Sequence, residues 1–173
     1  MKDIYLAGGC FWGVQRAINL IKGVEKTVVG YANGTVQSPT YEMVKTGQTN
    51  FVEAVLVRYD EKIIYLEEIL ELFFIFIDPT SLNKQGNDKG TQYRTGIYYL
   101  NNEDELVIAQ KLHNLQTKYQ LPIMVEFMKL KNFYTAEDYH QKYLEKNPNG
   151  YCHISSDKYE EISQYIPIQL KKQ

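Results

Sequence analysis

The stretch "LAGGCFWGV", Leu6 to Val14, marks the change from a first strand to a first helix. Residues Asp3 to Ala7 have the apolar character of a short buried strand, which ends at Gly8-Gly9. The apolar residues after the glycines recur at the spacing of a helix face: Val14, Ala17, Ile18 and Ile21. The pattern therefore places Cys10 at a strand-to-helix junction.

This position has consequences for the Cys10 thiol. Unpaired backbone N–H groups and the partial positive charge at a helix N-terminus favour thiolate, so we expect a pKa below the free value of about 8.5. Gly8 and Gly9 allow a sharp turn and leave room for a ligand near the sulfur. The junction predicts a nucleophilic cysteine.

Two large aromatic residues, Phe11 and Trp12, follow in the first helical turn. Rings that splay outward there would form an apolar wall suited to a methyl group. The alternative is that both rings fix the helix start to the core, and spacing alone does not separate the two.

Composition bounds the class of protein. The 173 residues suffice for one domain with a core, and 19 basic against 21 acidic residues leave a formal charge of −2. Basic residues are scattered, so neither nucleic acid nor an anionic membrane is an expected partner. The most apolar run, Leu72 to Ile77, is far shorter than the roughly 20 residues of a membrane span. Met1 to Ile4 lead into the first strand without a signal-peptide apolar region, so we expect a cytoplasmic protein, with monomer as the simpler state.

Periodicity predicts the remaining elements. Strands are expected at 51–59, 94–100 and 123–130, and helices at 63–77, after a cap at Asn102, and from a capping box at 135–138 through Tyr143. The order β-α-β-(α)-β-α-β predicts an α+β fold: a two-layer α/β sandwich with a ferredoxin-like split βαβ core, an inserted helix and long functional loops at 30–50 and 79–93. We expect one catalytic domain, 1–155, and a polar C-terminal tail, 156–173.

A polar cluster, "GNDKGTQYRTG" from Gly86 to Gly96, contains Asp88 and Tyr93. A loop that closes on the Cys10 helix could aim this carboxyl and phenol at one oxygen, with Tyr31 of "GYANG" as a third group. A plain turn is the alternative, and it is the commoner reading of such a segment.

The second cysteine, Cys152, lies almost a chain length from Cys10, which excludes a disulfide scaffold. From the residues alone it is an ordinary terminal cysteine in the pliable segment after Gly150-Tyr151. His140 and His153 with two distant thiols make a poor ligand set, so no metal is expected. "GGCFWG" also lacks the spacing of a dinucleotide loop or a P-loop.

Five segments taken together resemble the A-type peptide-methionine sulfoxide reductases: "GGCFWG", "GYANG", "PTYE", "DPTSLNKQGNDKGTQYR" and "EDYHQKYLEKNPNGYCHI". The match runs in order from about Ile4 to Ile154. It implies a peptide-methionine (S)-S-oxide reductase, an oxidoreductase of protein repair under oxidative stress. Free methionine sulfoxide, oxidised peptides and oxidised proteins are the implied substrates.

The resemblance also implies roles for individual residues. Cys10 would attack the sulfoxide sulfur and become a sulfenic acid, while the rings of Phe11 and Trp12 hold the methyl group. The hydroxyls of Tyr31 and Tyr93 would hydrogen-bond the sulfoxide oxygen.

In the same implied scheme, Asp88 would act on that oxygen through a water molecule. Cys152 would resolve the sulfenic acid as a disulfide that thioredoxin reduces. No metal or organic cofactor is implied.

The implied proton donor is a glutamate two residues after the tyrosine of "PTY", where this chain has Met43, with Glu42 one residue early. "TNFVEAV" also replaces "TGHAEAV", and Ile77 stands where a histidine often precedes "DPT". Three options follow: Glu42 reaches in through a shifted loop, the hydroxyls with Asp88 stabilise the oxygen alone, or turnover is slow. We favour the second option.

Two other functions stay open at this point. A different thiol enzyme, such as a peroxidase or a cysteine hydrolase, would use the same nucleophile, although a hydrolase needs a histidine directed at Cys10. A catalytically weak or silent module that binds oxidised methionine would follow from the missing glutamate.

Overall fold

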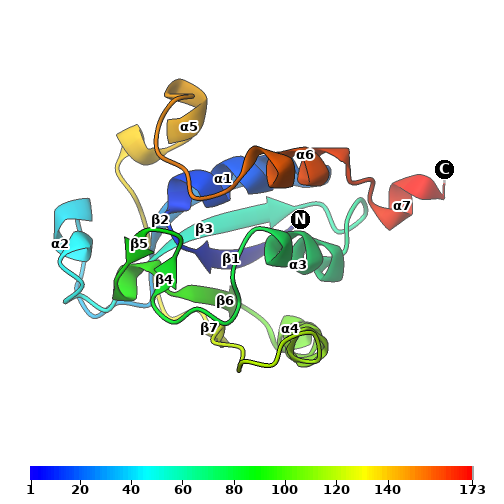
Figure 1. Cartoon of the computed structure of the whole chain (residues 1–173), viewed down its shortest axis with the longest axis horizontal. Helices are drawn as coiled ribbons and strands as arrows, with labels where there is room; N and C mark the ends of the chain where they lie inside the picture. The colour runs from blue at the N-terminus through cyan, green and yellow to red at the C-terminus, as the bar shows by residue number, and fades with distance from the viewer. Residues whose placement is uncertain (173) are drawn as a thin grey trace.

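The structure, a computed structural model, describes residues 1–172 (Figure 1). Gln173, the last residue of the predicted tail, lies outside the described residues. Within this range the main sheet has six strands in the order β7-β6-β1-β3-β2-β8. Their bounds are β1 Lys2–Gly8, β2 Val24–Ala32, β3 Val52–Tyr59, β6 Thr95–Tyr99, β7 Glu126–Lys129 and β8 Phe133–Thr135.

The helices are α1 Phe11–Asn19, α2 Tyr41–Lys45, α3 Leu66–Ile75, α4 Asn102–Gln116, α5 Tyr143–Lys146, α6 Ser156–Gln164 and α7 Ile168–Lys171. A small hairpin pairs β4 Lys84–Gln85 with β5 Asp88–Lys89, and 3-10 turns span Thr91–Tyr93 and Asp138–His140. None of the helices described is both long and apolar enough to cross a membrane.

The central four strands form two interlocked split βαβ units. β1 and β2 are joined through α1, and β3 lies between them, antiparallel to both. β3 and β6 are connected through α3, and β1 lies between them in the same way. This arrangement confirms the predicted α+β, ferredoxin-like core.

The strand assignment within that core was partly wrong. β2 was not predicted, and the segment 123–130 was counted in its place; that segment forms β7, which pairs parallel to β6 at the sheet edge. The first three residues of β2 include the exposed, charged Glu25 and Lys26. The apolar pattern that predicts a strand is therefore weak at the start of β2. The predicted loop at 30–50 accordingly begins after β2 and contains the short helix α2.

The predicted helix from the capping box at 135–138 is also wrong. β8 ends at Thr135, and only a 3-10 turn follows. The carboxyl of Glu137, inside the predicted capping box, accepts hydrogen bonds from the Tyr31 hydroxyl at 2.7 Å and the Tyr41 backbone N–H at 3.0 Å. Tertiary partners therefore outweigh the local cap. In α4 the cap is Asn101 rather than Asn102, because the Asn101 side chain accepts from the Asp104 N–H at 3.0 Å.

The two faces of the sheet bury unequal cores. The larger cluster joins the inward residues of the central strands to α1 and α3, and the smaller one lies on the opposite face around Tyr5 and Tyr98. At the end of β1, a Cβ on Gly8 would lie only 2.8 Å from Ile77 Cγ2. Because the backbone must approach Ile77, two residues after the end of α3, this closely, glycine is required where the chain turns toward Cys10.

Candidate active site

Cys10 is the N-cap of α1, and Gly9 before it has φ +89°, a left-handed conformation that favours glycine. The thiol is buried, and burial raises its pKa, as does the charge of Glu53. The backbone N–H of Trp12 favours thiolate but is outweighed, and Asp88 raises the pKa further. The predicted low pKa is therefore wrong: desolvation and two carboxyl groups exceed the effect of the helix N-terminus.

Glu53 is a buried acidic residue near Cys10 that was not among the predicted site residues. It lies on β3, is 2% exposed, and accepts a hydrogen bond from the Phe11 backbone N–H at 3.2 Å. Burial raises the pKa of Glu53 to about 8, despite the lowering effect of that N–H. The site thus holds a neutral carboxylic acid next to the thiol at pH 7. A single carboxyl inside the apolar run of "FVEAV" was the available signal.

Asp88 reaches the same place from the β4–β5 hairpin, so the predicted loop does close on the Cys10 turn. Burial raises the pKa of Asp88, while His153, the Tyr151 hydroxyl and the Cys10 backbone N–H act in the opposite direction. His153 Nδ1 lies 3.8 Å from Asp88 Oδ2, and its Nε2 lies 3.0 Å from the Gly8 carbonyl oxygen.

The phenols near the acid are those of Tyr41 and Tyr93. Burial raises the pKa of Tyr41 to about 12, and the charges of Glu53 and Cys10 add to the effect. Burial also raises the pKa of Tyr93, with contributions from Glu53, Tyr41 and Asp88. Burial and their influence on one another's pKa indicate that these groups lie near one another in a buried enclosure, on the side of the molecule where Figure 1 draws α2, the β4–β5 hairpin and the start of α1.

The Tyr31 hydroxyl is not directed at the same point as Asp88 and Tyr93, because it is bound to Glu137. The Tyr31 side chain is fully buried, and its hydroxyl donates to Glu137 at 2.7 Å. Since the same carboxylate holds the Tyr41 backbone, Tyr31 supports the segment that carries Tyr41 rather than offering a free hydroxyl.

Phe11 and Trp12 differ in how far their rings are buried. Phe11 is 1% exposed and belongs to the core, so the predicted outward ring is wrong and the helix-fixing alternative holds for it. The Trp12 ring is half-buried and stacks on Tyr143, with centroids 3.7 Å apart. Its indole N–H donates to His140 Nδ1 at 3.0 Å. Trp12 is therefore an ordered apolar wall that remains partly open to a ligand.

The positions considered for the acid on α2 lie outside this enclosure. Met43 is 36% exposed, and Glu42 is exposed beside it. Neither needs to reach the thiol, because Glu53 already occupies the adjacent buried position.

Cys152 is free, as is Cys10. Its Sγ lies 2.8 Å from the Tyr159 hydroxyl, and a Cβ on Gly13 would lie 3.0 Å from the sulfur. The sulfur is thus seated on α1, one turn after Cys10. The charge of Cys152 contributes to the raised pKa of Cys10, which also places the two thiols near each other.

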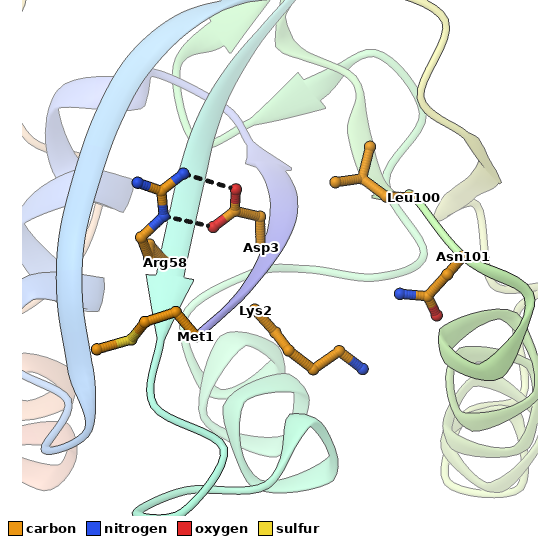
Figure 2. Close-up of a pocket in the computed structure, with 6 residues that line it drawn as sticks. All are labelled: Met1, Lys2, Asp3, Arg58, Leu100 and Asn101. Carbon is orange, nitrogen blue, oxygen red and sulfur yellow. Dashed lines mark hydrogen bonds and ion pairs between the residues drawn. The ribbon is translucent and has the colours of Figure 1, made fainter.

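A cavity of about 460 Å³ lies elsewhere, at the start of β1 (Figure 2). Its lining residues are Met1, Lys2, Asp3, Arg58, Leu100 and Asn101. Arg58 and Asp3 bind each other there through two hydrogen bonds of 2.9 Å, and the lining contains no cysteine, serine or histidine. Within residues 1–172 no group of three or more His, Cys, Asp or Glu side chains could hold a metal ion.

Comparisons with known proteins agree with this chemistry. A family model described as "Peptide methionine sulfoxide reductase" matches residues 2–169. The "Peptide methionine sulfoxide reductase MsrA" of Mycoplasma pneumoniae is 56% identical over 157 residues, which are 91% of this chain and 100% of the relative. The crystal structure of Mxr1 from Saccharomyces cerevisiae in reduced form has a TM-score of 0.84 at 39% identity, covering 96% of this chain and 93% of Mxr1. Mxr1 in complex with Trx2 has a TM-score of 0.59 at 29% identity, covering 82% and 85%.

Proposed function

Because this chain belongs to the peptide methionine sulfoxide reductase family, it reduces methionine sulfoxide with a thiol, and we propose that Cys10 is that thiol and Glu53 the acid. The observation that carries this assignment is the fully buried Glu53 carboxyl, bound to the N–H of the residue after Cys10. A sulfoxide sulfur becomes a good electrophile only when its oxygen is protonated or strongly hydrogen-bonded. Glu53 supplies such a proton.

In the first step the substrate methyl group lies against Trp12, and its oxygen faces Glu53 with Tyr41, Tyr93 and Asp88. Glu53 protonates the oxygen as the Cys10 sulfur bonds to the sulfoxide sulfur. The sulfur–oxygen bond of the substrate then breaks, and the oxygen passes to Cys10. In balance, the Cys10 S–H and the sulfoxide become a sulfenic acid and methionine, and the thiol proton restores Glu53. General acid catalysis contributes about 10²–10⁴-fold.

The raised pKa of Cys10 is compatible with this order of events. A protonated sulfoxide carries positive charge beside the sulfur, and an opposite charge favours the thiolate. The thiolate therefore forms when the substrate is bound, while the empty site keeps a less reactive thiol.

In the second step Cys152 attacks the sulfenic acid. The sulfur–oxygen bond breaks, a disulfide forms, and the hydroxyl leaves as water with the thiol proton of Cys152. Thioredoxin then reduces the disulfide; the structure of Mxr1 in complex with Trx2 supports this partner. The scheme needs no metal or organic cofactor, and a reducing cytoplasm is the compartment in which it would run.

The buried acid removes the reason for the silent-module hypothesis, which rested on an empty acid position. The hypothesis of another thiol enzyme is also not favoured, since the family match extends over nearly the whole chain.

A thioredoxin-coupled assay with the separated S and R epimers of methionine sulfoxide tests the proposal. We expect turnover of the S epimer, in free methionine sulfoxide and in oxidised peptides, and none by Cys10→Ser. Turnover by Cys10→Ser, or preference for the R epimer, would overturn it.

A further inference from the structure

The C-terminal segment packs against the domain rather than extending from it. α6 lies beside α1 (Figure 1), and Ile162 on α6 is fully buried. Farther along, the Tyr165 hydroxyl donates to Glu68 at 2.6 Å, and the Ile168 backbone N–H donates to the same oxygen at 2.7 Å. These contacts bind the chain after α6 to α3, while Tyr159 near the start of α6 contacts Gly13 and Arg16 of α1.

Tyr159 on α6 has its hydroxyl at the second cysteine. The oxygen lies 2.8 Å from Cys152 Sγ, and the hydroxyl donates to the Gly13 carbonyl oxygen at 3.3 Å. The Arg16 guanidinium lies over the Tyr159 ring, 5.1 Å from its centroid, and holds the ring on α1. The hydroxyl therefore bridges the Gly13 carbonyl oxygen and the Cys152 sulfur, and either the phenol or the thiol can donate between oxygen and sulfur.

These contacts fix the position of the Cys152 sulfur. Besides Tyr159, the backbone N–H of Ile154 donates to Cys152 Sγ at 3.4 Å. The missing side chain of Gly13 gives the sulfur its space, because a Cβ there would lie at 3.0 Å. Gly13 follows Cys10 by three residues, slightly less than one helical turn and about 4.5 Å along the axis.

We propose that Tyr159 is a positioning residue for the resolving step: its hydroxyl holds the Cys152 thiol on α1, one turn from Cys10. The inference rests on the resolving role proposed above for Cys152. When Cys10 becomes a sulfenic acid, the held thiol needs only a short movement to form the disulfide and release water. Positioning of this kind raises the effective concentration of a reacting group. Tyr159 on α6 thereby contributes to the resolving step.

Tyr159→Phe removes the hydroxyl and keeps the ring, and the two chemical steps can be timed separately. Reduced enzyme is mixed with excess methionine sulfoxide without thioredoxin, and methionine release and loss of free thiols are followed by rapid quench. We expect unchanged methionine release and disulfide formation slower by about tenfold, the size of one hydrogen bond. A burst of about one methionine per enzyme shows that the variant is folded.

Tyr165→Phe is the matched control, because it also removes a buried hydroxyl from the docked segment but does not touch Cys152. We expect both steps to keep the wild-type rate in this variant. An unchanged or faster disulfide rate in Tyr159→Phe would overturn the inference. Equal slowing in both variants would also overturn it, since only the docking of the segment would then matter.

Cys152→Ser separates this failure from a failure of the proposed function. We expect this variant to release about one methionine per enzyme and then stall with thioredoxin. Full thioredoxin-dependent turnover would refute the resolving role itself, whatever the result with Tyr159→Phe.

Discussion

The carboxyl of Glu53 accepts a hydrogen bond from the backbone N–H of Phe11 across 3.2 Å, although the two residues are 42 positions apart. This bond joins β3 to the first turn of α1 and places a buried acid beside Cys10. It also bears on the question raised by Met43, because the proton donor that we propose lies on β3 and not on α2.

Glu53→Gln removes the proton and keeps an oxygen that can accept the Phe11 N–H. We expect methionine release in a single turnover to slow by about 10²–10⁴-fold, with the fold retained. Near-wild-type release would show that another group donates the proton.

The pH dependence of methionine release follows from the same group. The pKa of Glu53 is raised to about 8, so the carboxyl is protonated below this pH and loses its proton above it. We expect the single-turnover rate to fall as pH rises through about 8. The profile of Glu53→Gln, measured at its lower rate, should lack this step.

The free energy of unfolding should also change with pH, between the ordinary and the raised pKa of Glu53. The folded-state pKa of Glu53 lies above its ordinary value of 4.5, so the folded chain binds more protons than the unfolded chain between those pH values. This contribution is complete below pH 4.5 and is lost as pH rises toward 8, by at most about 1.4 kcal/mol per pH unit. Urea unfolding at pH 5 and pH 8 should show a larger decrease for wild type than for Glu53→Gln. Equal decreases would contradict the assignment.

Met43→Glu tests whether the catalytic acid is Glu53 on β3 rather than a residue on α2. Met43 is exposed on α2, so a carboxyl there lies in water rather than beside Cys10. We expect an unchanged rate of methionine release, and likewise for Glu42→Gln. A rate increase in Met43→Glu would indicate that the α2 position is the acid site after all.

Tyr31→Phe and Tyr41→Phe should separate support from catalysis. Loss of the Tyr31 hydroxyl removes one charge-assisted hydrogen bond to Glu137 and leaves the one from the Tyr41 N–H, and we expect a loss of about 1.5–3 kcal/mol in unfolding free energy. Methionine release by the folded variant should stay near the wild-type rate. Tyr41→Phe should instead slow release with little change in unfolding free energy. The reverse pattern would indicate that the Tyr31 hydroxyl, and not that of Tyr41, binds the sulfoxide oxygen.

Local patterns predicted much of this molecule. The change from strand to helix at Gly8-Gly9 is confirmed, because alternating and helical periods are properties of neighbouring residues. The loop with Asp88 and Tyr93 also closes on Cys10 as expected. β2 and the missing helix at 135–143 were not predictable in this way: β2 is completed by pairing with β3, and Glu137 inside the predicted capping box binds Tyr31 and Tyr41.

The sequence by itself determined the chemistry that is present: one cysteine at a helix start, a second near the end, and aromatic residues beside the first. Only the tertiary structure decided which acid meets that cysteine and whether its thiol is charged. The reason is that a pKa depends on how much water and which charges surround a group. For Cys10 these are set by β3 and the β4–β5 hairpin, which lie more than 40 residues away in the chain.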